Sequence, residues 1–376
     1  MKIVDVKKLT VKYNGNVVGY LADLDGRIAF QYDREWQENG FSISPFSLSI
    51  SDKVFVCGKQ TFGGLYGVFA DSLPDGWGEL LFVRMLKAQG IDAGDVPLLS
   101  RLSLIDEFGM GALQYEPNLS EKIADERYEL DELSAGAEKI WMDRDSDADL
   151  DKIYRLAGSS GGARPKVHLK MGEDRWIVKF PCSYDVPDIG LHEFKANELA
   201  RKAGLCTNEY KIFPSKRFKG FFGAKRFDYE TGHRIHMVSL SSLLETSHRV
   251  PNLDYTHLLQ VIDKICVDKE DLYEAFARMC FNVIFGNKDD HGKNFAFLYD
   301  ENMRGYKLSP AYDITRTADK AEHEMSVNGN GNPSETDLLA IATNCNLNRE
   351  RCKTILERVK DVVLPEVPAA KPSKRK

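Results

Sequence analysis

The chain has 376 residues, enough for two or three domains with substantial cores. Apolar residues make up 43% and charged residues 29%, which is ordinary for a soluble globular protein, and no apolar run approaches the length of a membrane span. The net charge of −6 excludes a protein that binds nucleic acid through its overall electrostatic field, so a contact with DNA or tRNA needs a local patch or a partner.

The first residues and the cysteines indicate the compartment. The N-terminal sequence MKIVDVKKLTVKYNG lacks the apolar segment of a signal peptide. The seven Cys are scattered and include no C-x-x-C pair, so we expect buried apolar side chains or free thiols rather than disulfides or a zinc site. These features predict a cytoplasmic protein with no membrane partner.

Residues 1–120 are predicted to form an α+β subdomain. Residues 4–21 contain two β-rich runs around Asn14-Gly15, a strong signal for a hairpin turn. Residues 71–78, D-S-L-P-D-G-W-G, precede a predicted helix and are interpreted as turn and packing residues. We expect no catalytic constellation in this part of the chain.

A Gly-rich loop follows an acidic stretch. Residues 121–152 are polar and acidic and are predicted to form a linker that is helical in part. The sequence G-S-S-G-G-A-R-P-K (158–166) then suggests a phosphate-binding loop, because glycines let backbone N–H groups approach an anion. It matches neither G-x-x-x-x-G-K-[ST] nor G-x-G-x-x-G, and a flexible surface loop explains the same residues equally well.

A strand with one embedded Lys comes next. Residues 175–181, RWIVKFP, are similar to the V-A-I-K strand whose Lys holds the α- and β-phosphates of ATP, although a strand Lys is usually a solvent-facing side chain. Residues 191–203 predict an amphipathic helix. In it, Glu193 is the first candidate to pair with Lys179, and Glu198 is the second.

Residues 210–228 carry six Lys or Arg and five Phe. Basic stretches interleaved with aromatic residues can bind nucleic acid. Two central strands of a sheet, with the basic side chains on the outer face or at a nucleotide, are the preferred interpretation. From 229 to 286 the chain is expected to stay helical. A β-rich lobe followed by a helical lobe is the order of protein kinases.

The sequence FGNKDDHGKNFAF (285–297) lies between an apolar helix, predicted to stop at Gly286, and an apolar strand. In it, Asp289 and Asn294 have the spacing D-x-x-x-x-N, which is the second half of the kinase catalytic loop. There the Asp accepts the proton of the attacking hydroxyl and the Asn holds magnesium, so one short loop must carry both. A polar turn capped by Asx side chains explains the spacing alone more simply.

The residues after this loop favour the kinase interpretation. Strands are predicted at 295–299 and 305–308. A lone Asp, Asp313, then occupies the place of the metal-binding Asp of D-F-G. Ile314 follows it instead of Phe, so this motif is degenerate and the match rests on its context.

The C-terminal part begins with polar, Gly- and Asn-rich residues, 314–334, which fit a mobile activation-type segment. Helices are predicted at 335–342 and 348–363. The basic tail, 366–376, is expected to be disordered.

Five ordered motifs carry a family resemblance: G-S-S-G-G-A-R-P-K (158–166), W-I-V-K-F-P (176–181), K-R-F-D (225–228), D-D-H-G-K-N-F (289–295) and L-S-P-A-Y-D-I (308–314). Together with residues 71–78 and M-S-V-N-G (325–329), they resemble the HipA-type serine/threonine kinases, toxins of bacterial type II toxin–antitoxin pairs. The resemblance covers nearly the whole chain.

The resemblance implies an α+β, bilobal, protein-kinase-like fold and transfer of the ATP γ-phosphate to a protein Ser or Thr hydroxyl, with Mg²⁺ as the second cofactor. Its expected parts are an extra N-terminal α+β subdomain (1–120), a linker or helix (121–152), a β-rich N-lobe (153–230), an all-helical C-lobe (231–365) and the disordered tail (366–376).

The resemblance also implies a role for individual residues. Asp289 is the catalytic base, Asn294 and Asp313 hold the metal, and Glu193 forms the ion pair with Lys179. The loop 161–166 covers the ATP, and residues 225–227 line the hinge on the adenine side. The implied ATP-binding residues are Gly161, Gly162, Ala163, Arg164, Pro165, Lys166, Lys179, Lys225, Arg226, Phe227, His291, Gly292, Lys293, Asn294, Tyr312 and Asp313.

Ser159 falls at the position where the family autophosphorylates in its Gly-rich loop, a modification that would expel the loop and stop the enzyme. A phosphate dianion beside the ATP phosphates is repelled by them. Ser160 adjoins Ser159 and is the alternative site. Asp290, where some members have Gly, is a further departure, and it is either an indirect partner of the metal or merely a loop acid.

The implied partner is a small helix-turn-helix antitoxin (HipB-like), with contact to DNA only through that complex. In relatives the substrate is an aminoacyl-tRNA synthetase, an identity that does not follow from this sequence. Two other functions stay open: a kinase of small molecules or lipids, and a catalytically weak co-repressor. The joint presence of Asp289, Asn294, Asp313 and Lys179 argues against the co-repressor.

Overall fold

The computed structural model describes residues 3–105, 108–120, 128–143, 147–159, 161–230, 232–317 and 320–367. The chain divides into two compact units. Unit 1 comprises Met1–Phe194, Asn208–His248 and Ala296–Arg304, and unit 2 comprises Lys195–Thr207, Arg249–Phe295 and Gly305–Lys376. In the described part of the chain, every helix is too short or too polar to cross a membrane.

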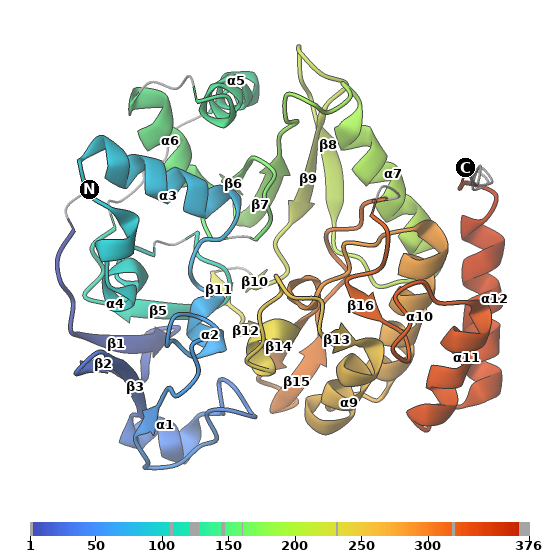
Figure 1. The fold of residues 1–376 in the computed structure, drawn as a ribbon, viewed down its shortest axis with the longest axis horizontal. Helices are drawn as coiled ribbons and strands as arrows, with labels where there is room; N and C mark the ends of the chain where they lie inside the picture. Colours follow the sequence, from blue (N-terminus) through green and yellow to red (C-terminus); the bar gives the residue numbers. More distant parts are fainter. Residues whose placement is uncertain are drawn as a thin grey trace. The chain divides into compact units, whose positions relative to one another are not determined.

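The N-terminal sheet of unit 1 is antiparallel and has the strand order β4-β3-β2-β1-β5 (Figure 1). The turn between β1 and β2 places Asn14 at φ +45° and Gly15 at φ +88°, as a tight hairpin requires, so the predicted hairpin is confirmed. Its strands are β1 (Lys8–Tyr13), β2 (Asn16–Leu24), β3 (Arg27–Tyr32), β4 (Phe55–Val56) and β5 (Leu113–Glu116).

A second antiparallel sheet of unit 1 has the order β6-β7-β9-β8 (Figure 1). It contains both strands expected within 210–228 and the strand that carries Lys179. Its strands are β6 (Lys166–Met171), β7 (Asp174–Lys179), β8 (Tyr210–Phe213) and β9 (Phe221–Lys225).

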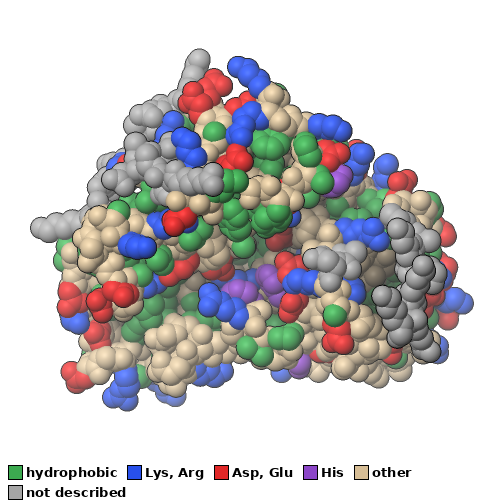
Figure 2. Space-filling view, turned by 45° about the horizontal axis from the view of Figure 1, so that its top comes forward, with side chains coloured by type: hydrophobic (Ala, Val, Ile, Leu, Met, Phe, Trp, Pro, Cys, Tyr) green, Lys and Arg blue, Asp and Glu red, His purple; other side chains and the backbone are tan. Residues whose placement is uncertain are grey.

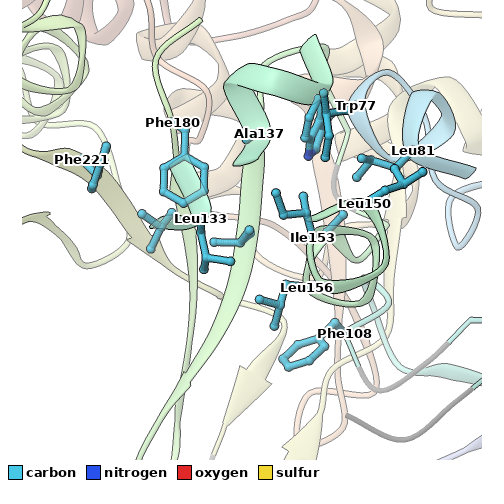
Figure 3. Close-up of a cluster of buried hydrophobic side chains, with 14 of the residues drawn as sticks. Trp77, Leu81, Phe108, Leu133, Ala137, Leu150, Ile153, Leu156, Phe180 and Phe221 are labelled. Carbon is cyan, nitrogen blue, oxygen red and sulfur yellow. The ribbon is translucent and has the colours of Figure 1, made fainter. Parts of the chain in front are cut away.

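One buried cluster joins this second sheet to three helices, α3 (Trp77–Ala88), α5 (Leu130–Trp141) and α6 (Asp147–Ala157). Figure 3 shows Trp77 and Leu81 of α3 in this cluster with Leu133 of α5 and Ile153 of α6. Parts of the chain that lie about 150 residues apart in sequence therefore share one core.

Much of the expected linker 121–152 is packed structure rather than a solvated connection. Leu133, Ala137 and Ile140 of α5 and Leu150 of α6 are buried, and α5 is amphipathic, with Glu132 and Lys139 exposed on its other side. Residues 121–127 and 144–146 lie outside the described residues. The predicted domain boundaries stay a prediction.

Unit 1 also contains shorter elements and the first part of α7 (Ile189–Lys202). Strand β12 pairs with β14 in antiparallel register, with Val238 opposite Phe297. The shorter elements are α1 (Arg34–Asn39), α2 (Gly67–Ala70), η1 (Ala93–Asp95), α4 (Leu98–Leu102), β10 (Tyr229–Glu230), β11 (His233–Arg234), β12 (Met237–Ser239), α8 (Leu240–Leu243) and β14 (Ala296–Asp300).

Unit 2 is built around α10 (Glu270–Phe285), which packs against α9, α11 and α12 (Figure 1). Phe276, Met279 and Phe281 of α10 are fully buried, and Gly286 ends the helix at φ +80°, as predicted. The other elements of unit 2 are β13 (Leu253–Asp254), α9 (Tyr255–Ile265), η2 (Gly292–Asn294), β15 (Gly305–Leu308), β16 (Met325–Ser326), α11 (Glu335–Asn344) and α12 (Arg349–Val363).

Two expectations for the C-terminal half are wrong. Residues 229–230, 233–234 and 237–239 form β10, β11 and β12 instead of a helix, and Gly232 turns the chain before β11 at φ +82°. The region 231–365 is not all-helical, since it also contains β13, β14, β15 and β16. These strands are short: AFLYD of β14 is buried from Ala296 to Tyr299, and GYKL of β15 alternates between partly buried and buried positions.

The charged surface fits the modest net charge. On the face shown in Figure 2, Lys and Arg side chains are interspersed with Asp and Glu side chains. The charged side chains on this face are therefore mixed in sign, as the net charge of −6 leads one to expect.

We predict that buried His236 makes unit 1 sensitive to acid. Its Nε2–H donates to the carbonyl oxygen of Ile43 at 2.9 Å, and burial lowers the pKa of His236 from 6.5 to about 4. Between these values the unfolded chain takes up a proton that the folded chain does not bind. The stability that neutral His236 contributes is therefore fully present above pH 6.5 and is lost as the pH falls toward 4.

The measurement is denaturant unfolding from pH 7 to pH 4.5, followed by tryptophan fluorescence, because all four Trp belong to unit 1. Compared with His236→Gln, the wild type should lose up to about 1.4 kcal/mol more unfolding free energy per pH unit. His192→Gln, at an exposed position of α7, is the matched control. Equal slopes in wild type and His236→Gln would contradict the prediction.

Candidate functional site

Lys179 and Glu193 form a buried ion pair in unit 1. Val178 faces the core, so the neighbouring Lys179 at the end of β7 points to the opposite face of the sheet. Its Nζ lies 2.5 Å from Glu193 Oε1 of α7, and the two side chains are only 16% and 8% exposed. Glu198, the second candidate from the sequence, is exposed further along α7. The strand and the helix thus supply the pair that sequence spacing favoured.

The Gly-rich loop is held by the segment 71–78. Asp75 Oδ1 accepts a hydrogen bond from the Gly162 N–H at 3.1 Å, and the Trp77 N–H donates to the Gly162 carbonyl oxygen at 3.0 Å. Gly76 has φ +48°, and a Cβ there would lie 2.5 Å from that carbonyl oxygen, so only Gly fits. These turn residues therefore shape the loop, a role that sequence reasoning missed.

Internal contacts also occupy the basic residues of this loop. Lys166 is buried, and its Nζ donates to the carbonyl oxygens of Gly161 and Gly162. Arg164 forms an ion pair with Asp185, whose carboxylate also accepts from the Cys182 N–H at 2.8 Å. Both cations thus fix the shape of the loop in this conformation. Ala163 and Pro165 complete the turn into β6, and the Pro165 carbonyl oxygen accepts from the Phe180 N–H at 2.8 Å.

Ser159 is buried at the start of the loop. Its side chain is 5% exposed, and its hydroxyl oxygen accepts from the Met110 N–H at 2.8 Å. In this conformation the hydroxyl therefore faces the protein interior. Ser160, the alternative modification site, lies outside the described residues.

Arg226 does not fit its expected contact with a nucleotide. Its guanidinium is 1% exposed, binds the Asp228 carboxylate through two bonds of 2.9 and 2.7 Å, and donates to the carbonyl oxygens of Phe108 and Gly109. Burial favours a raised pKa for the Asp228 carboxyl, but the charge and hydrogen bonds of Arg226 outweigh burial and lower it. A further N–H faces His168 Nδ1 at 3.2 Å, so the Arg226 side chain is a structural cation of unit 1 whose donors are directed inward.

Its neighbours in the K-R-F-D motif are more accessible. Lys225 is 30% exposed at the side chain and pairs with Asp174 at 2.6 Å, and Phe227 is half-buried. The motif thus combines one buried ion pair with two residues that reach the surface of unit 1.

The catalytic-type loop of unit 2 starts at Gly286 and closes with η2. The Asn294 side-chain N–H donates to the Asp289 carbonyl oxygen at 2.7 Å, and the Asn294 backbone N–H donates to the His291 carbonyl oxygen at 2.9 Å. These bonds explain the D-x-x-x-x-N spacing: they fold the loop back on itself. Because the amide nitrogen is engaged, the amide oxygen of Asn294 is the atom that can act as a ligand.

The remaining residues expected at this site lie near η2 and after β15. Gly292 and Lys293 belong to η2, and Tyr312 Oη donates to the Lys293 carbonyl oxygen at 2.5 Å. The residue that follows Tyr312, Asp313, has φ +55°, an uncommon conformation for a side-chain-bearing residue. The hydrogen bond therefore links the L-S-P-A-Y-D-I motif to the catalytic-type loop within unit 2.

Asp290 is buried and holds the loop through hydrogen bonds, so it is not merely an acid at the surface of the loop. Its Oδ2 accepts from Tyr255 Oη at 2.7 Å and from His323 Nδ1 at 2.8 Å, and its Oδ1 accepts from the Glu324 N–H at 3.0 Å and, at 3.4 Å, from the Met325 N–H. Burial and the Asp290 charge raise the pKa of Tyr255 well above its usual range. The carboxylate therefore joins the loop to α9 and to residues 323–325.

This anchor changes the interpretation of residues 314–334. Ile314, Met325 and Val327 are buried, and β16 pairs in parallel with β13. The described part of the segment is therefore packed against unit 2 over much of its length. Residues 318 and 319 lie outside the described residues.

The candidate oxygen ligands of unit 2 would suit magnesium better than a transition metal. Among the described residues, no group of three or more His, Cys, Asp or Glu could hold a metal ion by itself. Mg²⁺ needs only one or two protein oxygens beside substrate phosphates and water, which the Asn294 amide and the Asp313 carboxylate can supply. The residues present thus fit a metal that binds together with a nucleotide.

A strand Lys paired with a helix Glu, together with an Asp/Asn loop and a later Asp, is typical of kinase-type phosphotransferases. A family model of the HipA N-terminal domain matches residues 9–116, and a model of the HipA-like C-terminal domain matches residues 158–366. The chain belongs to the HipA family.

Similar proteins agree with this assignment. Over 347 residues the chain is 28% identical to a Sinorhizobium fredii protein named "Putative kinase Y4mE", covering 83% of this chain and 78% of the relative. A second S. fredii protein, "Putative kinase Y4dM", is 26% identical over 162 residues, which are 40% of this chain and 39% of that protein.

A solved structure supports the fold. HipA of Shewanella oneidensis MR-1, determined with HipB and its operator DNA, matches with a TM-score of 0.70 and 18% identity over 97% of this chain and 93% of that chain. The match confirms a HipA fold of mixed α and β structure.

We predict that Asp290 and Asp289 differ sharply in their effect on stability. In Asp290→Asn, an amide N–H₂ would face buried donors, so at least one of them loses its acceptor, and the unfolding free energy should fall by about 2–4 kcal/mol. The adjacent Asp289→Asn removes a charge from a carboxylate that is 35% exposed and should cost less than about 1 kcal/mol. Denaturant unfolding followed by circular dichroism measures both, and equal losses would contradict the anchor role.

Proposed function

We propose that the chain is an ATP-dependent serine/threonine kinase and the toxin of a toxin–antitoxin pair. The observation that carries the proposal is the buried Lys179–Glu193 ion pair, formed across β7 and α7. Removing a cation and an anion from water is costly, so such a pair is expected where it has a task. Next to a Gly-rich loop, the task that fits is to orient the Lys toward the phosphates of a nucleotide. Membership of the HipA family and the kinase names of the relatives support the same activity.

The residues of each unit have defined tasks in this reaction. Lys179, oriented by Glu193, binds nucleotide phosphates, and the loop 161–166 covers them. The Asn294 amide oxygen and the Asp313 carboxylate hold Mg²⁺. The bound metal supplies charge neutralisation for the phosphates of ATP. Lys225 and Phe227 contribute to the adenine side, whereas Arg226 supports them from the interior.

Asp289 is the general base. The oxygen of an acceptor Ser or Thr hydroxyl forms a bond to the γ-phosphorus of ATP while the bond from that phosphorus to the ADP oxygen breaks. The hydroxyl proton passes to the Asp289 carboxylate, and ADP leaves. His291, Gly292 and Lys293 shape the loop that carries this carboxylate, and Tyr312 fixes the loop through the Lys293 carbonyl oxygen.

Autophosphorylation at Ser159 switches the enzyme off in this proposal. Ser159 is buried and bound to Met110, so the loop must leave its observed position before the hydroxyl can be modified. A phosphate dianion cannot return to that interior position without losing its hydration, which keeps the loop out.

The proposed partner and substrate are those that membership of the family supports. The S. oneidensis HipA structure contains HipB and operator DNA, which supports a HipB-like helix-turn-helix antitoxin and a DNA contact made through that complex. The net charge of −6 agrees with an antitoxin that carries most of the DNA affinity. The proposed acceptor is a protein hydroxyl, with an aminoacyl-tRNA synthetase as the first candidate, and the reaction takes place in the cytoplasm.

Loss of the base should abolish transfer without unfolding the chain. After incubation with Mg-ATP, the intact mass of the wild type should increase by one phosphate, mapped to Ser159 or Ser160. Asp289→Ala should gain none and should retain the circular dichroism spectrum of the wild type. A variant that still transfers phosphate would overturn the proposed base.

The two glutamates of α7 offer a matched test of the ion pair. Glu193→Gln removes the charge that orients Lys179 and should lower kcat/KM for ATP at least about tenfold. Glu198→Gln makes the same change at an exposed position of the helix and should stay within about twofold of wild type. Initial rates at varied ATP concentration decide the matter, and equal effects of the two changes would count against the assigned role of Glu193.

A further inference from the structure

A second lysine, Lys320, reaches the carboxylate proposed as the base. Lys320 lies seven positions after Asp313, in the segment 314–334 that the sequence presented as a mobile connection. Its Nζ donates to Asp289 Oδ1 and also pairs with Glu324 Oε1 at 2.9 Å. All three residues belong to unit 2, so one compact unit contains the whole cluster.

The backbone around Lys320 is fixed to the loop that carries Asp289. Lys288, the residue before Asp289, donates from Nζ to the carbonyl oxygens of Lys320 and Ala321, both at 3.0 Å. The Lys288 N–H donates to Thr317 Oγ1 at 2.7 Å. Thr317, Lys320 and Ala321 are thus all hydrogen-bonded to Lys288 of the loop.

A further set of bonds fixes the segment after Lys320. The Glu324 N–H donates to Asp290 Oδ1 at 3.0 Å, and the same N–H lies 3.2 Å from the Lys288 carbonyl oxygen. His323 Nδ1 lies 2.8 Å from Asp290 Oδ2. Lys320 therefore extends from a backbone that is held on both sides, which limits where its ammonium group can lie.

The charge of Lys320 is secured by the same contacts. Burial alone would lower the pKa of the Lys320 ammonium, but its bonds to Asp289 and Glu324 outweigh burial and raise that pKa. The Lys320 and Asp289 side chains are each 35% exposed, and ion pairs with such exposure contribute about 1 kcal/mol or less to stability. Orientation of the carboxylate is therefore the larger consequence of the contact.

This orientation matters for proton transfer. A carboxylate has two oxygens, and a cation on Oδ1 fixes the plane of the group and leaves Oδ2 to accept a proton. A general base is effective only within hydrogen-bond reach of the hydroxyl that it deprotonates. A carboxylate free to rotate about its side-chain bonds would spend less time in that geometry.

We propose that Lys320 is a positioning residue for phosphoryl transfer, which holds the Asp289 carboxylate in the orientation that accepts the proton of the acceptor hydroxyl. The inference rests on the proposed function, because it assigns Asp289 as the base. It gives the segment 314–334 a task in the reaction: a change in its path would move the Lys320 ammonium and with it the carboxylate of Asp289.

Three variants at one position test the inference. Lys320→Met keeps a long, unbranched side chain without charge and should lower kcat about 10- to 100-fold, with KM for ATP changed by less than about threefold, because nucleotide contacts are assigned elsewhere. Lys320→Arg restores a cation and should recover kcat to within about fivefold of wild type. Lys320→Glu should be at least as slow as Lys320→Met, because it repels the carboxylate.

The measurement is the initial rate of phosphate incorporation by the full-length chain with Mg-ATP at varied concentration, together with the thermal unfolding midpoint of each variant. Lys353→Met, at an exposed position of α12, is the matched control and should behave as wild type. Midpoints within about 2 °C of wild type would exclude a purely structural effect.

The outcomes separate this inference from the proposed function. A wild type that transfers no phosphate to itself or to a protein acceptor overturns both. An active wild type with an equally active Lys320→Met overturns only the role of Lys320. A faster Lys320→Met would show that the contact blocks the base, and a rise in KM without loss of kcat would place Lys320 at the nucleotide; either result also overturns the inference.

Discussion

The buried carboxylate of Asp290 holds the catalytic-type loop of unit 2 in place. An anion removed from water is tolerated only when donors surround its oxygens. Asp290 receives hydrogen bonds from Tyr255 of α9, from His323 and from the backbone of residues 324 and 325. Asn282 of α10 extends the network by donating to Tyr255 Oη at 3.0 Å. Two helices and the segment after Asp313 are therefore tied to one residue of the loop. Asp289, its neighbour, has a fixed backbone and a side chain that still reaches solvent.

In unit 1, contacts with the segment 71–78 hold the Gly-rich loop next to the second sheet. The helices α3, α5 and α6 share a core with β6 and β7, so the segment 71–78 at the start of α3 is rigidly placed. Its Asp75 and Trp77 then bind the backbone of Gly162. This arrangement connects the N-terminal part of the chain mechanically to the loop. The internal contacts of Arg164 and Lys166 complete the same support.

Local patterns in the sequence predicted the elements that carry the site, and long-range contacts explain what they missed. The strand that ends at Lys179 and the helix that contains Glu193 can each be recognised from local residue patterns, and the Lys179–Glu193 ion pair expected between them is present. Arg226 has the same charge and setting as Lys225 in the sequence, yet it is buried because Asp228, Phe108 and Gly109 meet there in the fold. The strands at 229–239 were mistaken for helix, since short strands draw their stability from partners elsewhere in the chain.

The sequence by itself determined the family motifs, the D-x-x-x-x-N spacing of Asp289 and Asn294, and most helices and strands, because these depend on residues close together in the chain. Only the tertiary structure decided which charged side chains are buried and what they hold. Asp290 and Asp289 are adjacent and chemically identical, but one is an internal anchor and the other is paired with Lys320 at the surface of the loop. That difference comes from Tyr255, His323 and Lys320, which lie about 30 residues away in sequence on either side and reach the loop only after folding.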